Sequence, residues 1–359
     1  MPLTVLSIAF PFAPVGADAV GGAEQILGEL DQALVAAGAR SLVVACEASR
    51  PAGELFPVPL PRSAVLGEGD KAWCRAQLQT AMERALAAHG VDLIHMHGLD
   101  FYDYRLPPAI PVLVTLHMPL AWYPPGIWSR YSGKVQFCCV SPSQRRSGPP
   151  GFPACAVVEN GVPLQPHVPS VRRAEFAVVM GRICPEKNAH DALEAGTEAG
   201  LRVLLAGHAF PYREHQQYLQ EEILPRLHPA KDGVVHTWLG PLPRAQRQKL
   251  LAQARCLLHP TLAPETSSLV AMEALAAGTP VIAYPSGALP EIIEEGVTGY
   301  LVSNREEMAA AIRKVHTISS AACRRAAEQR FDRRRMIDGY FALYQQMLGH
   351  RGSVRESYA

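Results

Sequence analysis

Residues 256–283 read CLLHPTLAPETSSLVAMEALAAGTPVIA. The apolar run Cys256–His259 predicts a buried strand, Ser267–Ala277 predicts a helix, and Pro280–Ala283 predicts the next strand. A strand, a helix and a second strand in this order predict two parallel strands joined by a crossover. The polar sequence ETSS follows the first strand, at the sheet edge where ligands bind in folds of this kind.

The same alternation continues on both sides of this unit. Further strands are expected at Leu3–Phe10, Ser41–Cys46, Asp92–His95, Val112–Leu116, Gln136–Val140, Ala156–Val158, Phe176–Met180, Leu201–Ala206 and Val234–Thr237, and further helices at Ala23–Ala37, Asp70–His89, Asn188–Ala199, Tyr212–Leu227, Pro243–Ala254 and Arg334–Leu348. Alternation of short strands with longer amphipathic segments is typical of α/β proteins with doubly wound parallel sheets.

The chain of 359 residues is long enough for about two domains. The segment Asn160–Ser170 (NGVPLQPHVPS) contains three prolines, interrupts the alternation and is interpreted as a linker. We therefore expect an N-terminal Rossmann-like domain over residues 1–165 and a second one over 166–333, facing each other across a central cleft. Residues 334–359 are expected to form a C-terminal helix that packs back on the N-terminal domain.

Composition excludes several function classes. The net charge of +1 argues against a nucleic-acid binder, and no apolar run reaches the roughly 18 residues that span a bilayer. The start MPLTVLSIAF lacks a basic region and is interpreted as a first strand, so a cytoplasmic enzyme is expected. The eight cysteines are scattered without a C-x-x-C pair, which favours reduced buried thiols over a structural zinc site. Peripheral membrane contact and the oligomeric state are left open.

The ETSSLVAME segment carries the most informative charges. Glu273 is the only charged side chain between Glu265 and Glu291, and it lies in an otherwise apolar helix. A buried carboxylate is costly unless a partner satisfies it, so a ligand-binding role is favoured over a solvent-facing one. Ser267 and Ser268 are good N-cap residues, and the amides near Ser268–Val270 would favour a phosphate.

The segment GRICPEK follows the strand FAVVM directly and places two cations at a strand end. Gly181 opens this turn, and Arg182 and Lys187 follow it. An arginine fork and a lysine point charge together suit a diphosphate group. The alternative interpretation is a pair of solvated surface cations.

The N-terminal half offers weaker candidates. Gly21 and Gly22 (GGAE) open the first helix and would allow a close approach of backbone to ligand, although a plain loop is equally compatible. This is no G-x-G-x-x-G fingerprint, which disfavours a nicotinamide oxidoreductase. His117 ends the strand PVLVTLH and could orient a hydroxyl or stabilise charge, or be purely structural.

Two further groups of side chains are candidates on the same half. His95 and His97 (IHMHG) share a strand face, but no third ligand is evident, so no metal is predicted and a cleft role is favoured for His97. Arg145 and Arg146, in CCVSPSQRRSGPP, could meet an anionic acceptor, although a surface turn is the simpler interpretation.

The motifs GGAE, H-x-H-G, T-L-H, E-N-G-V, G-R-I-x-x-E-K and E-x7-E, with EALAAGTPVIAYPSGALPEIIEEGVTGYLV, resemble those of the glycosyltransferases of family 4. These are retaining enzymes of the GT-B fold. The resemblance extends over nearly the whole chain and is strongest over about Phe176–Val302. It implies a glycosyltransferase of class EC 2.4 that moves a sugar from a nucleotide diphosphate sugar, with uridine or guanosine as the base.

The resemblance also implies a role for each donor-side residue. Arg182 and Lys187 would neutralise the diphosphate, and the amides near Leu269–Val270 would receive its distal phosphate. Glu273 would hydrogen-bond the ribose hydroxyls, and Glu265 would contact the donor sugar. No cofactor and no catalytic metal are implied.

On the N-terminal side the resemblance implies that His117 lies beside the reacting sugar and that Gly22 lies close to the phosphates. Acceptors are normally bound on this side, where His97, Arg145 and Arg146 are the candidates; the acceptor could be a saccharide, a lipid-linked molecule or a small natural product. The sequence departs from the family at Thr266–Ser268, which replace the usual glycine or aromatic residue. Two alternatives stay open: a GT-B sugar-nucleotide epimerase or hydrolase, and an inactive nucleotide-sugar-binding subunit.

Overall fold

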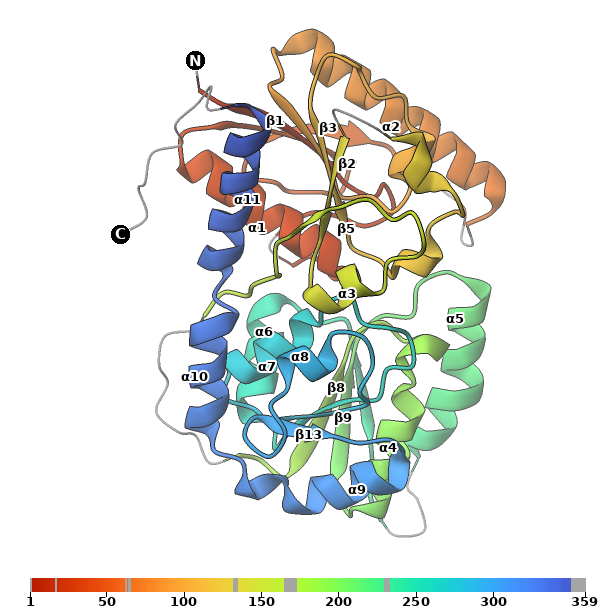
Figure 1. The fold of residues 1–359 in the computed structure, drawn as a ribbon. Coiled ribbons are helices and arrows are strands. Elements are labelled where there is room, and N and C mark those ends of the chain that lie inside the picture. The colour runs from red at the N-terminus through yellow and green to blue at the C-terminus, as the bar shows by residue number, and fades with distance from the viewer. Residues whose placement is uncertain are drawn as a thin grey trace. The chain divides into compact units, whose positions relative to one another are not determined.

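A computed structural model describes residues 2–16, 18–61, 63, 66–131, 135–164, 173–228 and 233–349. The chain divides into two compact units: Met1–Asn160 together with Arg334–Ala359, and Gly161–Arg333. The boundary expected after residue 165 falls outside the described residues. Each unit is built around its own parallel sheet (Figure 1).

The N-terminal unit contains a seven-stranded sheet among its described residues, in the order β3-β2-β1-β4-β5-β6-β7. Every adjacent pair of strands is parallel. The strands are β1 (Thr4–Ile8), β2 (Arg40–Cys46), β3 (Glu54–Val58), β4 (Leu93–Met96), β5 (Val112–Leu116), β6 (Val135–Cys139) and β7 (Ala156–Val157), and the α-helices are α1 (Gly22–Ala36), α2 (Glu68–Ala88), α3 (Pro142–Arg146) and α11 (Arg333–Met347).

Apolar periodicity explains how these elements pack. All five residues of β1 are buried, as expected for a central parallel strand covered on both faces. The helix α11 contributes Tyr340 and Tyr344, which are fully buried. The hydroxyl of Tyr344 lies 2.7 Å from Nδ1 of His95 on β4, so the last helix is bonded to the centre of the N-terminal sheet.

The described part of the second unit repeats the plan with a six-stranded parallel sheet, in the order β10-β9-β8-β11-β12-β13. Its strands are β8 (Phe176–Met180), β9 (Arg202–Ala206), β10 (Thr237–Gly240), β11 (Leu257–His259), β12 (Val281–Ala283) and β13 (Gly299–Leu301), and its α-helices are α4 (Ala189–Glu198), α5 (Arg213–Tyr218), α6 (Arg244–Gln253), α7 (Leu269–Ala276), α8 (Leu289–Ile292), α9 (Arg305–Lys314) and α10 (Ser320–Arg330). The fold class expected from the sequence is therefore confirmed.

Three strands differ from expectation, and all three are edge strands. The strand expected at Val234–Thr237 begins only at Thr237, because β10 is an edge strand without a fully buried apolar run. β3 and β13 were not expected. β3 contains Pro57, which is tolerated because β3 is itself an edge strand. β13 has three residues and begins at Gly299, where a Cβ would lie 1.9 Å from the carbonyl oxygen of Val281.

The strand order positions the candidate sites. In each sheet the order reverses beside the first strand, between β1 and β4 and between β8 and β11. Crevices outside the carboxyl ends of such strands are the usual ligand sites of doubly wound sheets. The loops that follow β8 and β11 in the second unit, and those that follow β1 and β4 in the first, are therefore the places where binding residues are expected.

Candidate functional site

The loop after β8 begins with a close backbone contact that only glycine allows. Gly181 has φ = +150°, and its N–H donates to the carbonyl oxygen of Ala206 at 3.0 Å. A Cβ on Gly207 would lie 1.7 Å from the carbonyl oxygen of Gly181. Arg182 follows, and its Nη1 lies 3.2 Å from Oε1 of Glu186. This ion pair keeps the Arg182 guanidinium near the end of β8.

Lys187 connects the loop after β8 to the loop after β11, the neighbouring strand. It ends the short 3-10 turn Pro185–Lys187, and the next residue, Asn188, has φ = +53° and precedes α4. Its Nζ donates to Oε1 of Glu265, which comes from the loop after β11. The side chains are 23% and 10% exposed, so the pair is largely withdrawn from water.

Glu265 receives a second partner from the end of β11. Nε2 of His259 lies 3.3 Å from Oε1 of Glu265 and also 3.3 Å from Oγ of Ser268. Burial alone would raise the pKa of Glu265, but the charge of Lys187 and the contact with His259 outweigh it and hold that pKa well below its ordinary value. Glu265 is therefore an anion whose charge is balanced before any ligand arrives.

The helix α7 opens beside this cluster. It begins at Leu269, two residues later than expected, because Ser268 is the N-cap and its Oγ accepts from the N–H of Ala271 at 3.4 Å. The amides of Leu269 and Val270 belong to the first turn, where helical N–H groups have no intrahelical partner. Glu273 lies one turn later and is partly buried.

Gly287 and the residue after it lie against the backbone of Glu265. The N–H of Ala288 donates to the carbonyl oxygen of Glu265 at 2.8 Å. Gly287 has φ = +58°, and a Cβ there would lie 2.2 Å from the same oxygen. This close approach fixes the backbone from which the Glu265 carboxylate extends.

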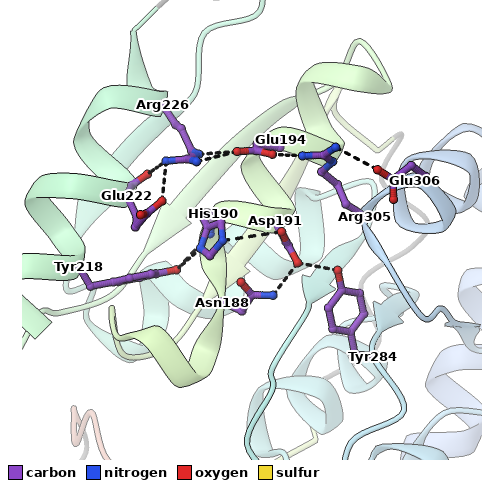
Figure 2. Close-up of polar contacts among 10 residues, drawn as sticks. All are labelled: Asn188, His190, Asp191, Glu194, Tyr218, Glu222, Arg226, Tyr284, Arg305 and Glu306. Carbon is purple, nitrogen blue, oxygen red and sulfur yellow. Dashed lines mark hydrogen bonds and ion pairs between the residues drawn. The ribbon is translucent and has the colours of Figure 1, made fainter. Parts of the chain in front are cut away.

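A polar network anchors α4, the helix that follows Lys187 (Figure 2). Nδ1 of His190 lies 2.9 Å from the hydroxyl of Tyr218 on α5. Oδ2 of Asp191 accepts from Nδ2 of Asn188 at 2.6 Å and from the hydroxyl of Tyr284 at 2.7 Å. These contacts tie the start of α4 to α5 and to the end of β12, and so restrain the loop that carries Lys187.

The N-terminal unit brings its histidines together. Nε2 of His117, directly after β5, lies 3.1 Å from Nδ1 of His97, directly after β4. His95 bonds instead to Thr115, with 2.8 Å between its Nε2 and Oγ1. Burial lowers the pKa of His117 to about 4, so the ring is neutral at pH 7. A neutral imidazole has one ring nitrogen that donates a hydrogen bond and one that accepts.

The remaining N-terminal candidates lie at helix ends. Gly21 is the N-cap of α1, where a Cβ would lie 1.9 Å from the carboxylate of Glu24. Arg145 and Arg146 end the five-residue helix α3 and are exposed. Their helix is capped by Ser141, whose Oγ accepts from the N–H of Gln144 at 3.0 Å.

The structure thus gathers Gly181, Arg182, Lys187, Glu265 and Ser268 on the loops after β8 and β11 of one unit. His259, Gly287 and Glu186 were not expected from the sequence, although each makes a direct contact in this cluster. His259 had a detectable signal, since it is a polar residue at the carboxyl end of an apolar strand. Gly287 had no detectable signal in the sequence, because its contact with Glu265 forms only when the two loops meet in the folded chain.

Two family models cover most of the chain. Residues 20–165 match Glycosyltransferase Family 4, and residues 167–330 match Glycosyl transferases group 1.

None of the helices in the described ranges combines the length and the apolar character that a bilayer span requires.

Similar proteins agree with these matches. A glycogen synthase of Mycobacterium tuberculosis is 26% identical over 91% of this chain and 89% of its own length. A D-inositol 3-phosphate glycosyltransferase of Mycolicibacterium smegmatis is 32% identical over 52% of this chain and 46% of its own. Among solved structures, Anabaena HepE in complex with UDP-glucose superposes with a TM-score of 0.71 at 20% identity, over 96% of this chain and all of that one.

Proposed function

Since this chain belongs to the family 4 glycosyltransferases of the GT-B fold, we propose that it is a retaining enzyme that transfers a sugar from a nucleotide diphosphate sugar to a hydroxyl acceptor. The observation that carries this proposal is the cluster of Arg182, Lys187 and Glu265 at the point where the strand order of the second sheet reverses. The two cations and the capped start of α7 suit the diphosphate, and the ionised carboxylate suits the hydroxyls of the sugar.

In the proposed reaction the donor bond between C1 and the diphosphate oxygen breaks while the acceptor oxygen bonds to C1 on the same face. Negative charge grows on the leaving diphosphate, where Arg182 and Lys187 stabilise it. The acceptor proton passes to an oxygen of the departing phosphate. We propose that no metal takes part in this chemistry.

Glu265 is assigned to the donor sugar's hydroxyls rather than to nucleophilic attack. Its Oε1 is shared by Lys187 and His259, and both contacts lower the nucleophilicity of the carboxylate. Ser268, Leu269 and Val270 are proposed to hold the distal phosphate, and Glu273 the ribose hydroxyls. Gly181 keeps the backbone after β8 open toward the phosphates. In the N-terminal unit, His117 is proposed to contact the transferred sugar. Gly21 and Gly22 are proposed to lie close to the phosphates. The acceptor is proposed to contact His97, Arg145 and Arg146.

The relatives suggest which ligands to try first. HepE was solved with UDP-glucose, and the M. smegmatis relative is named for inositol 3-phosphate. A UDP-hexose is therefore the first donor to test, with a GDP-sugar second, and saccharides, polyols and their phosphates are the first acceptors.

A thermal-shift screen with UDP, GDP, ADP, TDP and their sugars tests the proposal. We expect one nucleotide to raise the melting temperature selectively, because a ligand that binds only the folded chain stabilises it by mass action. Nuclear magnetic resonance of the product should then show the donor's anomeric configuration retained. Donor converted without any acceptor would favour the epimerase or hydrolase, and a shift with no turnover across the acceptor panel would favour a binding subunit. No shift with any nucleotide would contradict the proposal.

A further inference from the structure

Three side chains of different chemistry converge beside Arg182. Cys184 and Glu186 come from the turn after β8, and His215 comes from α5. One ligand atom of each, a thiol sulfur, a carboxylate oxygen and a ring nitrogen, lies within 4.8 Å of the other two. Cys184 is completely buried, and the side chain of Glu186 is 28% exposed, which leaves a route from solvent.

His215 adds an independent observation. The residue is only 8% exposed, and its Nδ1 is buried without a hydrogen-bond partner among the described residues. Buried ring nitrogens are normally satisfied by protein or water. An ion held by this nitrogen would supply the missing partner.

The scaffold around the three side chains is well anchored. The carbonyl oxygen of Glu186 accepts from the N–H of Leu262 at 2.9 Å and from Oγ1 of Thr261 at 3.2 Å. On α5, Tyr218 lies three residues after His215 and contacts His190 of α4 through its hydroxyl (Figure 2). Ligands held on fixed elements lose little conformational entropy when an ion binds.

We propose that Cys184, Glu186 and His215 form a binding site for a borderline-soft divalent cation, with Zn²⁺ the best match. Sulfur, imidazole and carboxylate are the ligands of zinc, whereas Mg²⁺ and Ca²⁺ take sets of oxygen atoms. A tetrahedral zinc ion holds its ligand atoms ~3.3–3.7 Å apart, so side-chain shifts of about 1 Å close the site. The fourth position is left for water.

Binding exchanges one proton for one metal–sulfur bond. The Cys184 thiol loses its proton to solvent as the sulfur bonds to the ion, with no change in oxidation state. Glu186 gives one oxygen to the ion and can keep the other on Arg182, which now lies 3.2 Å from Oε1. The site is distinct from the sugar-transfer chemistry and adjoins it through Arg182.

Cobalt titration of the full-length chain, stripped of metal by a chelator, tests this site. Co²⁺ in place of Zn²⁺ should give the intense thiolate-to-cobalt charge-transfer absorption, saturating at one ion per chain, and Zn²⁺ should abolish it. Cys184→Ser should remove that absorption, and His215→Gln should weaken Co²⁺ binding at least tenfold.

Matched controls separate this site from the other thiols and imidazoles. Cys155→Ser changes a partly exposed free thiol, and His316→Gln changes an exposed imidazole, so both should bind Co²⁺ as the wild type does. Circular dichroism checks that each variant is folded; if Cys184→Ser is not, His215→Gln and Glu186→Gln carry the test. Absence of the charge-transfer band in the wild type, or its persistence in folded Cys184→Ser, would overturn the proposal.

Discussion

Lys187 and Glu265 form a direct ion pair between two loops that follow neighbouring strands of the second sheet. They are 78 residues apart in sequence. The pair places a cation and an anion at the site proposed for the sugar diphosphate. It also means that either partner, if removed alone, leaves the other as a largely buried charge.

Replacement of Lys187 by alanine is expected to affect function and stability separately. Nucleotide affinity and turnover should each fall at least tenfold, because the diphosphate loses a cation. The free energy of unfolding should fall by roughly 1–3 kcal/mol, because Glu265 loses its lysine partner and keeps only the contact with His259. Calorimetry with the nucleotide found in the screen, and urea unfolding, measure the two effects.

The double variant Lys187→Ala/Glu265→Gln distinguishes these effects. Removal of the Glu265 charge, which has lost Lys187, should restore most of the lost stability, but nucleotide affinity should stay low. Recovery of nucleotide binding in the double variant would mean that Lys187 acts only by neutralising Glu265. That result would remove Lys187 from the diphosphate site.

The contact between Gly287 and Glu265 makes a second prediction. Gly287→Ala should destabilise the chain by at least about 2 kcal/mol more than Gly296→Ala, and should weaken donor binding. Both glycines have positive φ, but a Cβ at 296 would meet nothing within 4 Å, whereas one at 287 meets the Glu265 backbone. Equal losses in the two variants, measured by urea unfolding, would show that only the φ angle matters.

Much of this architecture could be predicted from local sequence. Apolar runs and their alternation with helices indicate two doubly wound sheets, because central parallel strands must be buried on both faces. The same reasoning places Arg182, Lys187 and Glu265 at strand ends. Edge strands such as β3 and β10 are harder to predict in this way, because they have a neighbouring strand on one side only. Their residues are less completely buried, so they lack a continuous apolar run.

Contacts between distant loops could not be predicted in the same way. The pairing of Lys187 with Glu265 depends on which strands are neighbours, and the sequence order does not state this. The contact between the Glu265 backbone and Gly287 depends on how the loop after β11 and the loop after β12 meet in the folded chain. The cluster of Cys184, Glu186 and His215 likewise has no spacing signature, because one member comes from a different helix.

Glu273 is the donor-side residue whose assigned role is easiest to isolate. Glu273→Gln should weaken nucleoside diphosphate binding at least tenfold, because the amide is a poorer acceptor for two ribose hydroxyls than a carboxylate. Inorganic pyrophosphate, which has no ribose, should bind both forms equally. Isothermal titration calorimetry with both ligands makes the comparison. An equal loss for both, or none for either, would place Glu273 outside the ribose site.

Asp100, just after β4, should produce a distinct pH dependence of stability. Burial raises the pKa of its carboxyl to about 6, while the hydroxyl of Tyr104 donates to Oδ2 at 2.6 Å. The folded state therefore favours the protonated acid, so this stabilisation is full below the ordinary Asp pKa of about 4 and is lost as the pH rises through 6. Asp100→Asn does not titrate, so its stability relative to wild type should increase by roughly 2–3 kcal/mol between pH 4 and pH 8. Urea unfolding across this range measures the difference, with the exposed Glu221→Gln as the control for loss of a charge. A pH-independent difference between Asp100→Asn and wild type would contradict the raised pKa.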